Sequence, residues 1–427
     1  MQTQALPGFR DFYPGDFALR AYIFRTWRTV AARYGFEEYD GPPLEPLELY
    51  TAKSGDEIVG QLYAFTDKGE RDVALRPEMT PTLARMVAAS ATSLKKPIRW
   101  FSIPQLFRYE RQQRGRLREH FQLNCDLIGE RGPLGDAEIV ALAIDVMRAF
   151  QLGPDDVRVR ISDRRLLGAI LSSLGFGGER ERLAHQVLDK MGRREYASRK
   201  QALLDTGAPE TAVRELESFK GLVDLDEIVR KYPGAGSAAE PLRSTLEALD
   251  AMGLGGFVDL DLTIVRGLAY YTGTVFELFD ADQSLRAICG GGRYDNLLES
   301  LGGVDLPALG FGMGDVVLGE LLKDRGVTPE ATPSIDVFIA GITGDDLPHI
   351  LATAHELRDA NLRVEYALNV LALGKQLNLA NARHARWAVL IGPDERARNE
   401  VMLRNLEDKS QVAVPRDQLV ARLAGAN

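Results

Sequence analysis

Apolar positions along the first part of the chain follow two different rhythms. Residues 17–34 repeat apolar side chains at helical spacing, and Gly35 follows at a position where helices commonly end. Short apolar runs typical of strands come next, separated by further helical stretches. We predict strands at 71–75, 98–103, 122–128, 157–161, 258–260 and 274–279, and helices at 81–89 and 137–151. Between them, residues 41–46 contain three prolines and predict a turn, a sheet edge or an interface.

The pattern changes between about residue 172 and residue 250. Charged helical segments occupy 179–191 and 194–206, and few strand signals accompany them. We interpret this stretch as a helical insertion in the first domain. The alternative is one more pair of surface helices belonging to the core.

A linker and a second domain are predicted towards the C-terminus. Residues 324–333 contain one glycine and two prolines. After them strands and helices alternate regularly, which predicts an α/β domain with a partly parallel sheet. Its strands are expected at 335–340, 362–367, 387–391 and 411–414, and its helices at 346–360, 370–382 and 416–423. The expected limits are 1–325 for the first domain, 326–332 for the linker and 333–427 for the second domain.

Composition narrows the function classes. The 427 residues carry a net charge of −9, so any contact with nucleic acid must use local basic patches. Two distant cysteines exclude a disulfide scaffold and fit a reducing compartment. The sequence has no run of about 18 apolar residues, so we predict no membrane span. The N-terminus does not show the pattern of a secretory signal. We expect a cytoplasmic protein, although the interior of an organelle would leave the same composition.

The stretch 107–122 concentrates positive charge between two predicted strands. It holds five arginines, at positions 108, 111, 114, 116 and 118. Arginine's planar fork suits phosphate or carboxylate, so Arg108 on the first strand could stabilise charge on a triphosphate. The later arginines, on the loop of the hairpin, suit a polyanion such as a tRNA end. The alternative is a solvated basic face paired with Glu110 and Glu119.

Two further clusters point to a small ligand. Arg266 precedes Tyr270 and Tyr271, a combination able to hold a zwitterion with a flat side chain; alternatively, this is a turn before a strand with a tyrosine in the core. Glycine runs at 290–292 and 310–314 permit close approach of the backbone to a ligand, and each run taken alone favours a plain turn. The chain has no dinucleotide-binding or P-loop motif, and its histidines form no metal-ligand pattern.

Together these motifs resemble the histidyl-tRNA synthetase family of class II aminoacyl-tRNA synthetases, over nearly the whole chain. The matching segments are 6–12 (the family's opening), 34–42 (motif 1), 107–122 (motif 2), 308–314 (motif 3), 266–271 and 291–295 (the two histidine signatures), and the domain from about 332 with Gly374-Lys375-Gln376 (the anticodon-binding domain). The resemblance implies a class II-like antiparallel sheet catalytic domain with a helical insertion and an anticodon-binding-like α/β domain. It also implies a homodimer formed through motif 1.

The resemblance further implies that the chain ligates histidine to tRNA(His), using ATP with Mg²⁺, and it assigns roles to residues. Arg266 and Arg108 are the expected catalytic cations. The residues expected to bind histidine are Glu78, Thr80, Gln122, Asp126, Tyr270, Tyr271 and Tyr294. Those expected to bind ATP are Arg108, Arg116, Arg293, Gly310 and Gly312. Arg114 and Arg116 are expected to contact tRNA, and no metal ligands are expected in the protein.

Two departures from the family pattern stand out. Ala269 replaces the aspartate of the commonest histidine signature, and residues 314–317 lack the arginine that usually ends motif 3 and covers the adenine. These departures resemble a branch also found in plant organelles. We expect another cation, Arg293, to take part of the missing role.

Two other functions compete with this interpretation. The first is a silent paralogue that senses histidine as the regulatory subunit of ATP phosphoribosyltransferase. Such subunits usually lack the anticodon-binding domain and the arginines matched here by Arg108 and Arg266. The second is a synthetase for another amino acid such as proline or threonine, against which the tyrosine-containing signatures argue.

Overall fold

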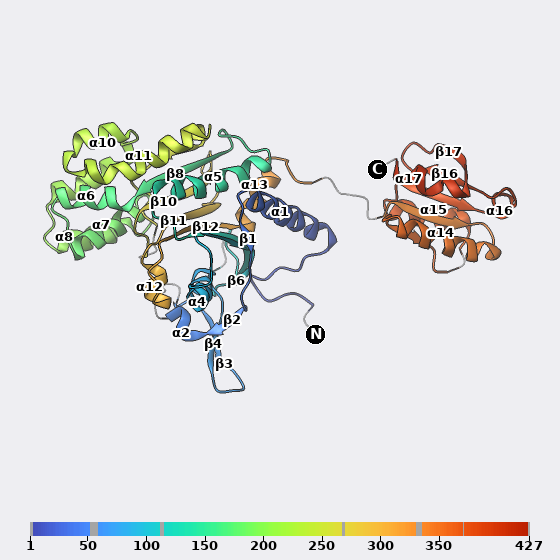
Figure 1. The fold of residues 1–427 in the computed structure, drawn as a ribbon, viewed down its shortest axis with the longest axis horizontal. Helices are drawn as coiled ribbons and strands as arrows, with labels where there is room; N and C mark the ends of the chain where they lie inside the picture. Colours follow the sequence, from blue (N-terminus) through green and yellow to red (C-terminus); the bar gives the residue numbers. More distant parts are fainter. Residues whose placement is uncertain are drawn as a thin grey trace. The chain divides into compact units, whose positions relative to one another are not determined.

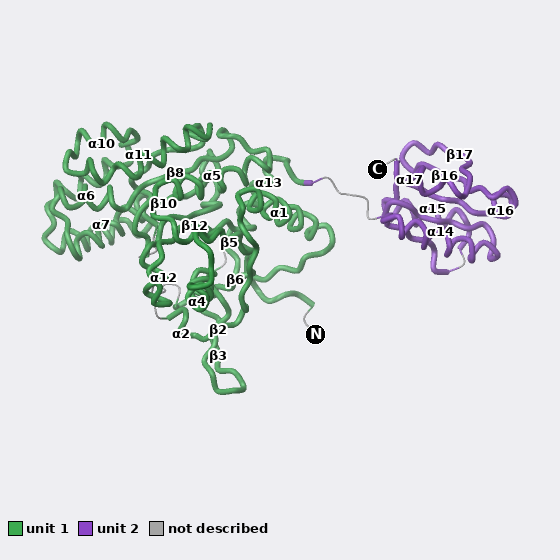
Figure 2. The backbone as a smooth tube through the Cα atoms, in the orientation of Figure 1, with its two compact units in different colours: residues 1–328 green, residues 329–427 purple. Residues whose placement is uncertain are grey.

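The computed structural model describes residues 3–51, 59–111, 115–266, 270–329, 335–369 and 371–425. The chain divides into two compact units, residues 1–328 and 329–427 (Figure 2). The domain limits expected at 325 and 333 stay predictions, because part of the connecting segment lies outside the described residues. None of the described helices is long and apolar enough to cross a membrane.

A large mixed sheet forms the centre of the first unit (Figure 1). Its strand order is β1-β5-β7-β12-β11-β10-β8-β9, with β6 paired to the outer part of β7. Neighbouring strands are antiparallel except for β1 with β5 and β8 with β9. The strands are β1 Glu37–Glu38, β5 Ile98–Ser102, β6 Gln105–Phe107, β7 Glu119–Ile128, β8 Val157–Asp163, β9 Val258–Leu260, β10 Thr274–Asp280, β11 Cys289–Arg293 and β12 Ala308–Gly314.

Helices cover one face of this sheet and build the main core there. They are α1 Pro14–Arg33, α5 Pro133–Ala149, α6 Arg164–Ser173 and α13 Asp315–Asp324. The odd-numbered residues Leu123, Cys125 and Leu127 of β7 point into this core, as strand alternation requires. Helix α1 ends as the sequence predicts: Gly35 has a φ of +73°, and the N–H of Phe36 donates to Ala31 O at 3.1 Å.

The other face carries a smaller apolar core beside the site described below. Helices α4 Thr80–Ser90 and α12 Leu297–Gly302 pack together there. Nearby, a short sheet has the order β2-β4-β3, with β2 Leu44–Pro46, β3 Tyr63–Thr66 and β4 Asp72–Leu75, and helix α2 Leu47–Thr51 lies against it. Pro46 therefore sits on an edge strand, one of the three expected places for it.

The segment from about 172 to 250 is helical, as predicted. Its elements are α7 Glu179–Asp189, α8 Tyr196–Asp205, α9 Glu210–Ser218, η1 Phe219–Gly221, α10 Leu225–Lys231, η2 Pro233–Ala235 and α11 Gly236–Ala251, followed by η3 Gly255–Phe257. Their buried apolar residues continue the main core without a break, and α11 packs on α5. Calling this segment an insertion stays our interpretation.

The second unit confirms a partly parallel α/β domain. Its sheet has the order β14-β13-β15-β16-β17, parallel across β14, β13 and β15 and antiparallel beyond. The strands are β13 Val337–Gly341, β14 Val364–Tyr366, β15 Trp387–Ile391, β16 Glu400–Asn405 and β17 Gln411–Pro415; the helices are η4 Gly344–Asp346, α14 Leu347–Asp359, α15 Leu373–Ala382, α16 Pro393–Arg398, η5 Arg416–Gln418 and α17 Leu419–Ala424. The sequence did not indicate α16 or β16.

The glycine runs correct one expectation. Taken alone, each run favours a turn, but residues 289–293 and 308–314 form β11 and β12, adjacent strands inside the large sheet. Pairing with the neighbouring strands holds these segments extended, although their glycines contribute no side chains.

Candidate active site

Two adjoining cavities lie among β7, β11 and β12, on the face of the sheet opposite α5. The outer cavity has a volume of about 270 Å³ and the inner one about 80 Å³. Both are lined by Arg108, Gln122, Arg266, Gly290 and Gly312, so they form one composite site. Most of the residues expected from the sequence gather here. The inner cavity adds Glu78, Thr80, Asp126, Tyr270, Tyr271, Tyr294 and Gly310, and the outer cavity adds Arg116.

Strand alternation explains which side chains of β7 reach the site. Gln122, Asn124 and Asp126 are two residues apart, and all three line the inner cavity. The motif-based expectation included the first and the third but omitted Asn124. The period of a strand was the signal that could have found it.

Glycines on β11 and β12 make room for these side chains, and we call Gly290, Gly310 and Gly312 the glycine floor. A Cβ atom at Gly310 would lie 2.5 Å from Oδ1 of Asp126, and one at Gly312 would lie 2.7 Å from Cδ of Gln122. A Cβ at Gly290 would lie 1.9 Å from Nη1 of Arg266. Such separations are far below van der Waals contact. At Gly310 a Cβ would also meet the backbone oxygen of Cys125 at 2.5 Å, whereas at Gly290 and Gly312 it would displace the ends of the Arg266 and Gln122 side chains from the site.

Arg266 reaches the boundary between the cavities from a constrained backbone. Its φ is +52°, in the left-handed region that non-glycine residues rarely adopt, and Arg164 donates from Nη2 to Arg266 O at 2.8 Å. Its Nη1 lies 2.8 Å from Oε1 of Glu277 on β10, a partner that the sequence did not indicate. Its Nε is buried and has no hydrogen-bond partner among the described residues. A buried unpaired donor at a cavity wall is suited to a ligand oxygen.

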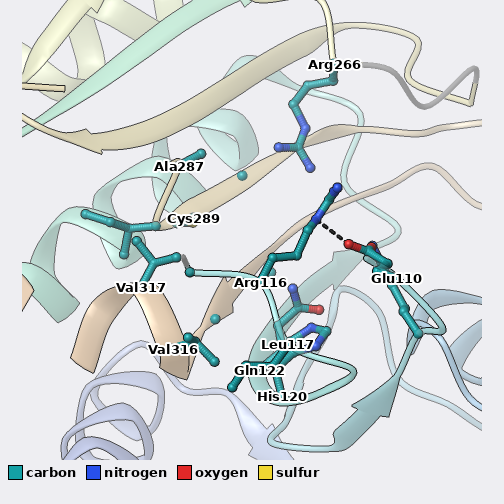
Figure 3. Close-up of a pocket in the computed structure, with 16 residues that line it drawn as sticks. Glu110, Arg116, Leu117, His120, Gln122, Arg266, Ala287, Cys289, Val316 and Val317 are labelled. Atoms are coloured by element: carbon teal, nitrogen blue, oxygen red, sulfur yellow. Dashed lines mark ion pairs between the residues drawn. The ribbon is translucent and has the colours of Figure 1, made fainter. Parts of the chain in front are cut away.

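Arg108 and Arg116 bring further positive charge from the predicted hairpin, which the pairing of β6 with β7 confirms. Arg108 directly follows β6 and donates from Nε to Pro77 O at 2.9 Å, which ties it to the segment bearing Glu78. Arg116 forms an ion pair with Glu110, and its guanidinium faces that of Arg266 across the outer cavity (Figure 3). The alternative interpretation was a solvated basic face paired with Glu110 and Glu119. Glu110 does pair with an arginine, but that arginine, Arg116, also lines a cavity.

Glu119 takes a different partner. Arg10, near the N-terminus, donates from Nε to Glu119 Oε1 at 2.6 Å and from Nη1 to Asp315 Oδ2 at 2.9 Å. Asp315 also accepts a hydrogen bond from Phe121 N at 2.9 Å. These contacts join the opening segment, the hairpin and the end of β12, three segments that the sequence analysis singled out separately.

Aromatic rings and two carboxyl groups, those of Glu78 and Asp126, line the inner cavity. The ring centroids of Tyr270 and Tyr271 are 4.9 Å apart, and that of Tyr294 is 5.9 Å from Tyr270. Tyr294 donates its hydroxyl hydrogen bond to Asp126. Burial raises the pKa of Asp126 to about 7, while the hydrogen bond from Tyr294 opposes that rise. Asp126 therefore changes its charge near neutral pH. Tyr271 is buried in the core as well as lining the cavity, so both of its expected environments apply.

His120 lines the outer cavity, where the sequence gave it no role. Burial, together with the positive charges of Arg108 and Arg10, lowers its pKa to about 3. The imidazole is therefore neutral at physiological pH and can both donate and accept a hydrogen bond.

The structure corrects the expectation for Arg293. Its side chain is 1% exposed and points away from the cavities, as its position on β11 next to Gly292 requires. It donates to Asp136 of α5 at 2.8 Å and to the carbonyl oxygens of Glu130 and Gly132. Arg293 thus joins β11 to the start of α5 and lines neither cavity. The expectations for Arg114 and Ala269 concern positions outside the described residues.

Comparisons with known proteins agree with this geometry. The family model for histidyl-tRNA synthetase matches residues 8–314, and that for an anticodon binding domain matches 336–425. A histidine–tRNA ligase of Opitutus terrae is 46% identical over 424 residues, which are 98% of this chain and 97% of the relative. The chloroplastic/mitochondrial histidine–tRNA ligase of Arabidopsis thaliana is 38% identical over 95% of this chain and 84% of the relative. The crystal structure of histidyl-tRNA synthetase from Nostoc has a TM-score of 0.85 at 26% identity, with complete coverage of both chains.

A mixed sheet with a composite cationic cavity, followed by a separate anticodon-binding unit, defines an aminoacyl-tRNA synthetase. The matches over nearly the full length are more specific: the chain belongs to the histidyl-tRNA synthetase family. Enzymes of this family use ATP and bind histidine and its tRNA.

Proposed function

We propose that this chain activates L-histidine with ATP to histidyl-adenylate and transfers the histidyl group to the 3′ end of tRNA(His). The observation that carries the proposal is the shared wall of the two cavities. A small, tyrosine-lined cavity with a titratable carboxyl adjoins a larger cationic one, and Arg108 and Arg266 line both. An amino acid in the first cavity and a triphosphate in the second would meet at these arginines.

In this proposal the histidine carboxylate attacks the α-phosphorus of ATP and pyrophosphate leaves. Arg108 and Arg266 stabilise the charge that grows at the α-phosphate, without waiting for solvent to reorganise. The terminal ribose hydroxyl of the tRNA then attacks the activated carbonyl and releases AMP. Both steps depend on positioning and fixed charge, so no covalent enzyme intermediate is needed.

The remaining roles divide between the two cavities. Glu78 and Thr80 hold the α-amino group, and Gln122, Asp126 and the three tyrosines enclose the rest of histidine. Arg116 and the backbone at Gly310 and Gly312 contact ATP. Among the described residues no cluster of three or more His, Cys, Asp or Glu side chains could hold a metal ion. We therefore propose that Mg²⁺ enters bound to the phosphates of ATP.

We also propose a homodimer formed through motif 1. Its strand β1 is the outermost strand of the large sheet, both of its residues are exposed, and its free edge is open to pairing or covering. A cytoplasmic location stays a prediction from the sequence.

The regulatory-subunit alternative has less support. A solved structure from Bacillus halodurans, described as an ATP phosphoribosyltransferase regulatory subunit/histidyl-tRNA synthetase, has a TM-score of 0.77 at 21% identity, a likeness that shows the fold alone. This chain has an anticodon-binding unit, and both Arg108 and Arg266 line the cavities. A sensor of histidine would need neither feature.

Exchange of labelled pyrophosphate into ATP tests the function directly. With a panel of amino acids, only histidine should support exchange, because the inner cavity offers a carboxyl group and aromatic rings suited to an imidazole. Exchange with proline or threonine instead would identify a different synthetase. Histidine binding without exchange by any amino acid would support the silent paralogue.

A second prediction separates tRNA contact from ATP contact on the hairpin. Arg114→Glu should raise the KM for tRNA and reduce the slope of its salt dependence by about one, because one phosphate contact is lost. The KM for ATP should stay unchanged. Arg116→Ala is the matched comparison and should raise the KM for ATP, since Arg116 lines the outer cavity. An unchanged tRNA KM in Arg114→Glu at several salt concentrations would contradict the assignment.

A further inference from the structure

A third cavity, of about 590 Å³, borders the outer cavity, and two of the arginines that line it were not singled out by the sequence. Arg116, Arg193 and Arg286 line it, together with one acidic residue, Glu277. Glu277 already pairs with Arg266 at 2.8 Å. The third cavity also shares Gly115, Ala287 and Val317 with the outer cavity, so a ligand can extend from one into the other.

The three arginines come from separate parts of the first unit. Arg116 belongs to the hairpin, Arg286 to the loop between β10 and β11, and Arg193 to the connection between α7 and α8 in the helical segment. Residues so far apart in sequence converge on one cavity only through the fold. Their guanidinium groups repel one another: burial lowers the pKa of Arg286, and the charges of Arg116 and Arg193 lower it further. A polyanion in the cavity would relieve this repulsion.

Arg286 also lies beside the place where this chain departs from motif 3. A Cβ atom at Gly115 would be 3.3 Å from Cγ2 of Val317 and 3.7 Å from Cδ of Arg286, so these two side chains are close neighbours. Val317 belongs to the segment 314–317 that lacks the usual arginine. A cation is therefore present near this position, supplied by another loop.

We propose that Arg286 and Arg193, with Arg116, bind the β- and γ-phosphates of ATP and the departing pyrophosphate. The proposal rests on the function proposed above. When the carboxylate oxygen bonds to the α-phosphorus, the bond from that phosphorus to the bridging oxygen breaks and its electron pair leaves with pyrophosphate. The added negative charge then lies next to three fixed cations. Arginine forks suit this ligand because each can donate two parallel hydrogen bonds to a phosphate group.

The test compares Arg286→Ala, Arg193→Ala and Arg286→Lys in the full chain. Arg182→Ala is the matched control, because Arg182 is an exposed arginine of α7 that pairs with Glu179 and lines none of the cavities described here. In the exchange reaction each alanine variant should raise the KM for pyrophosphate about tenfold, with a smaller change in kcat. Arg286→Lys should retain part of the affinity, and Arg182→Ala should match the unmodified chain. Calorimetric titration with pyrophosphate alone should show the same order.

Other outcomes would overturn the proposal. A raised KM for tRNA with an unchanged KM for pyrophosphate would make the cavity a site for a tRNA phosphodiester. Unchanged constants for both ligands would make the three arginines structural. If Arg286→Ala failed to fold, Arg286→Lys and Arg193→Ala would still decide. If the unmodified chain showed no exchange with histidine, the proposed function would fail, and the titrations with pyrophosphate would still test this cavity.

Discussion

Replacing Arg266 by alanine should slow histidyl-adenylate formation about 10²–10³-fold, the usual cost of losing one preorganised donor to a developing negative charge. Arg266→Lys should recover part of the rate, because lysine keeps the charge but loses the planar fork. Transfer from preformed adenylate to tRNA should suffer much less, since the chemistry at the α-phosphorus is then complete. Single-turnover rates of the two half-reactions measure both effects.

The structure also offers a competing role for Arg266, which the same experiment can reject. Arg266 pairs with Glu277 on β10 and has a φ of +52°, so its role could be purely structural. The backbone penalty at this φ is the same for arginine, lysine and alanine, so a purely structural role would act through the contact with Glu277. Its loss would lower both half-reactions and the melting temperature together. Equal losses in both steps would refute the catalytic assignment.

Asp126→Asn should raise the KM for histidine by about a hundredfold, because truncating one partner of a buried charged contact typically costs 2–5 kcal/mol. In the unmodified chain the KM should fall as pH rises through about 7, where the carboxyl group ionises. The asparagine variant should lose this component. The imidazole of the substrate histidine titrates near 6.5 whichever protein is assayed. The ratio of the two KM values at each pH therefore isolates the contribution of Asp126.

The same substitution, which should weaken histidine binding, should favour the folded state increasingly as pH rises. The folded-state pKa of Asp126 is raised from 3.8 to about 7, so its contribution to stability is fully present below about pH 4 and is lost as pH rises through 7. The asparagine side chain of the variant carries no charge to bury. As pH rises from 5 to 8, the melting temperature of the variant should therefore increase relative to that of the unmodified chain. A constant difference across this range, with an unchanged KM for histidine, would show that Asp126 neither ionises as stated nor binds the substrate.

The local sequence pattern was sufficient to predict structure wherever that structure depends on a single segment of the chain. The helix at 17–34, the hairpin around Arg108 and the alternation in the second unit all depend on spacing along the sequence, and the structure has each of them. Most of the residues that the sequence motifs singled out line the same two cavities. These features depend on near neighbours and on recognisable residue combinations.

The predictions were wrong or incomplete where the outcome depends on the face of a strand to which a side chain points, or on contacts between distant segments. Arg293 and Tyr294 are adjacent in sequence, yet one points to α5 and the other to Asp126, because successive side chains of an extended strand face opposite ways. The glycine runs carry no side-chain pattern, so nothing local distinguished a strand from a turn. The cation beside Val317 could not be found either, since no spacing connects residue 286 with residues 115 and 317.

The glycine floor restricts how this site can be engineered. Any other residue at Gly290 or Gly312 would displace the end of the Arg266 or Gln122 side chain, and any other residue at Gly310 would meet Asp126 and the backbone oxygen of Cys125, so each change would disturb a group that lines the site. A library for directed evolution towards an unnatural amino acid should keep these positions fixed. Asn124 lines the inner cavity from β7 and carries none of the roles proposed above, so it is the position to vary first.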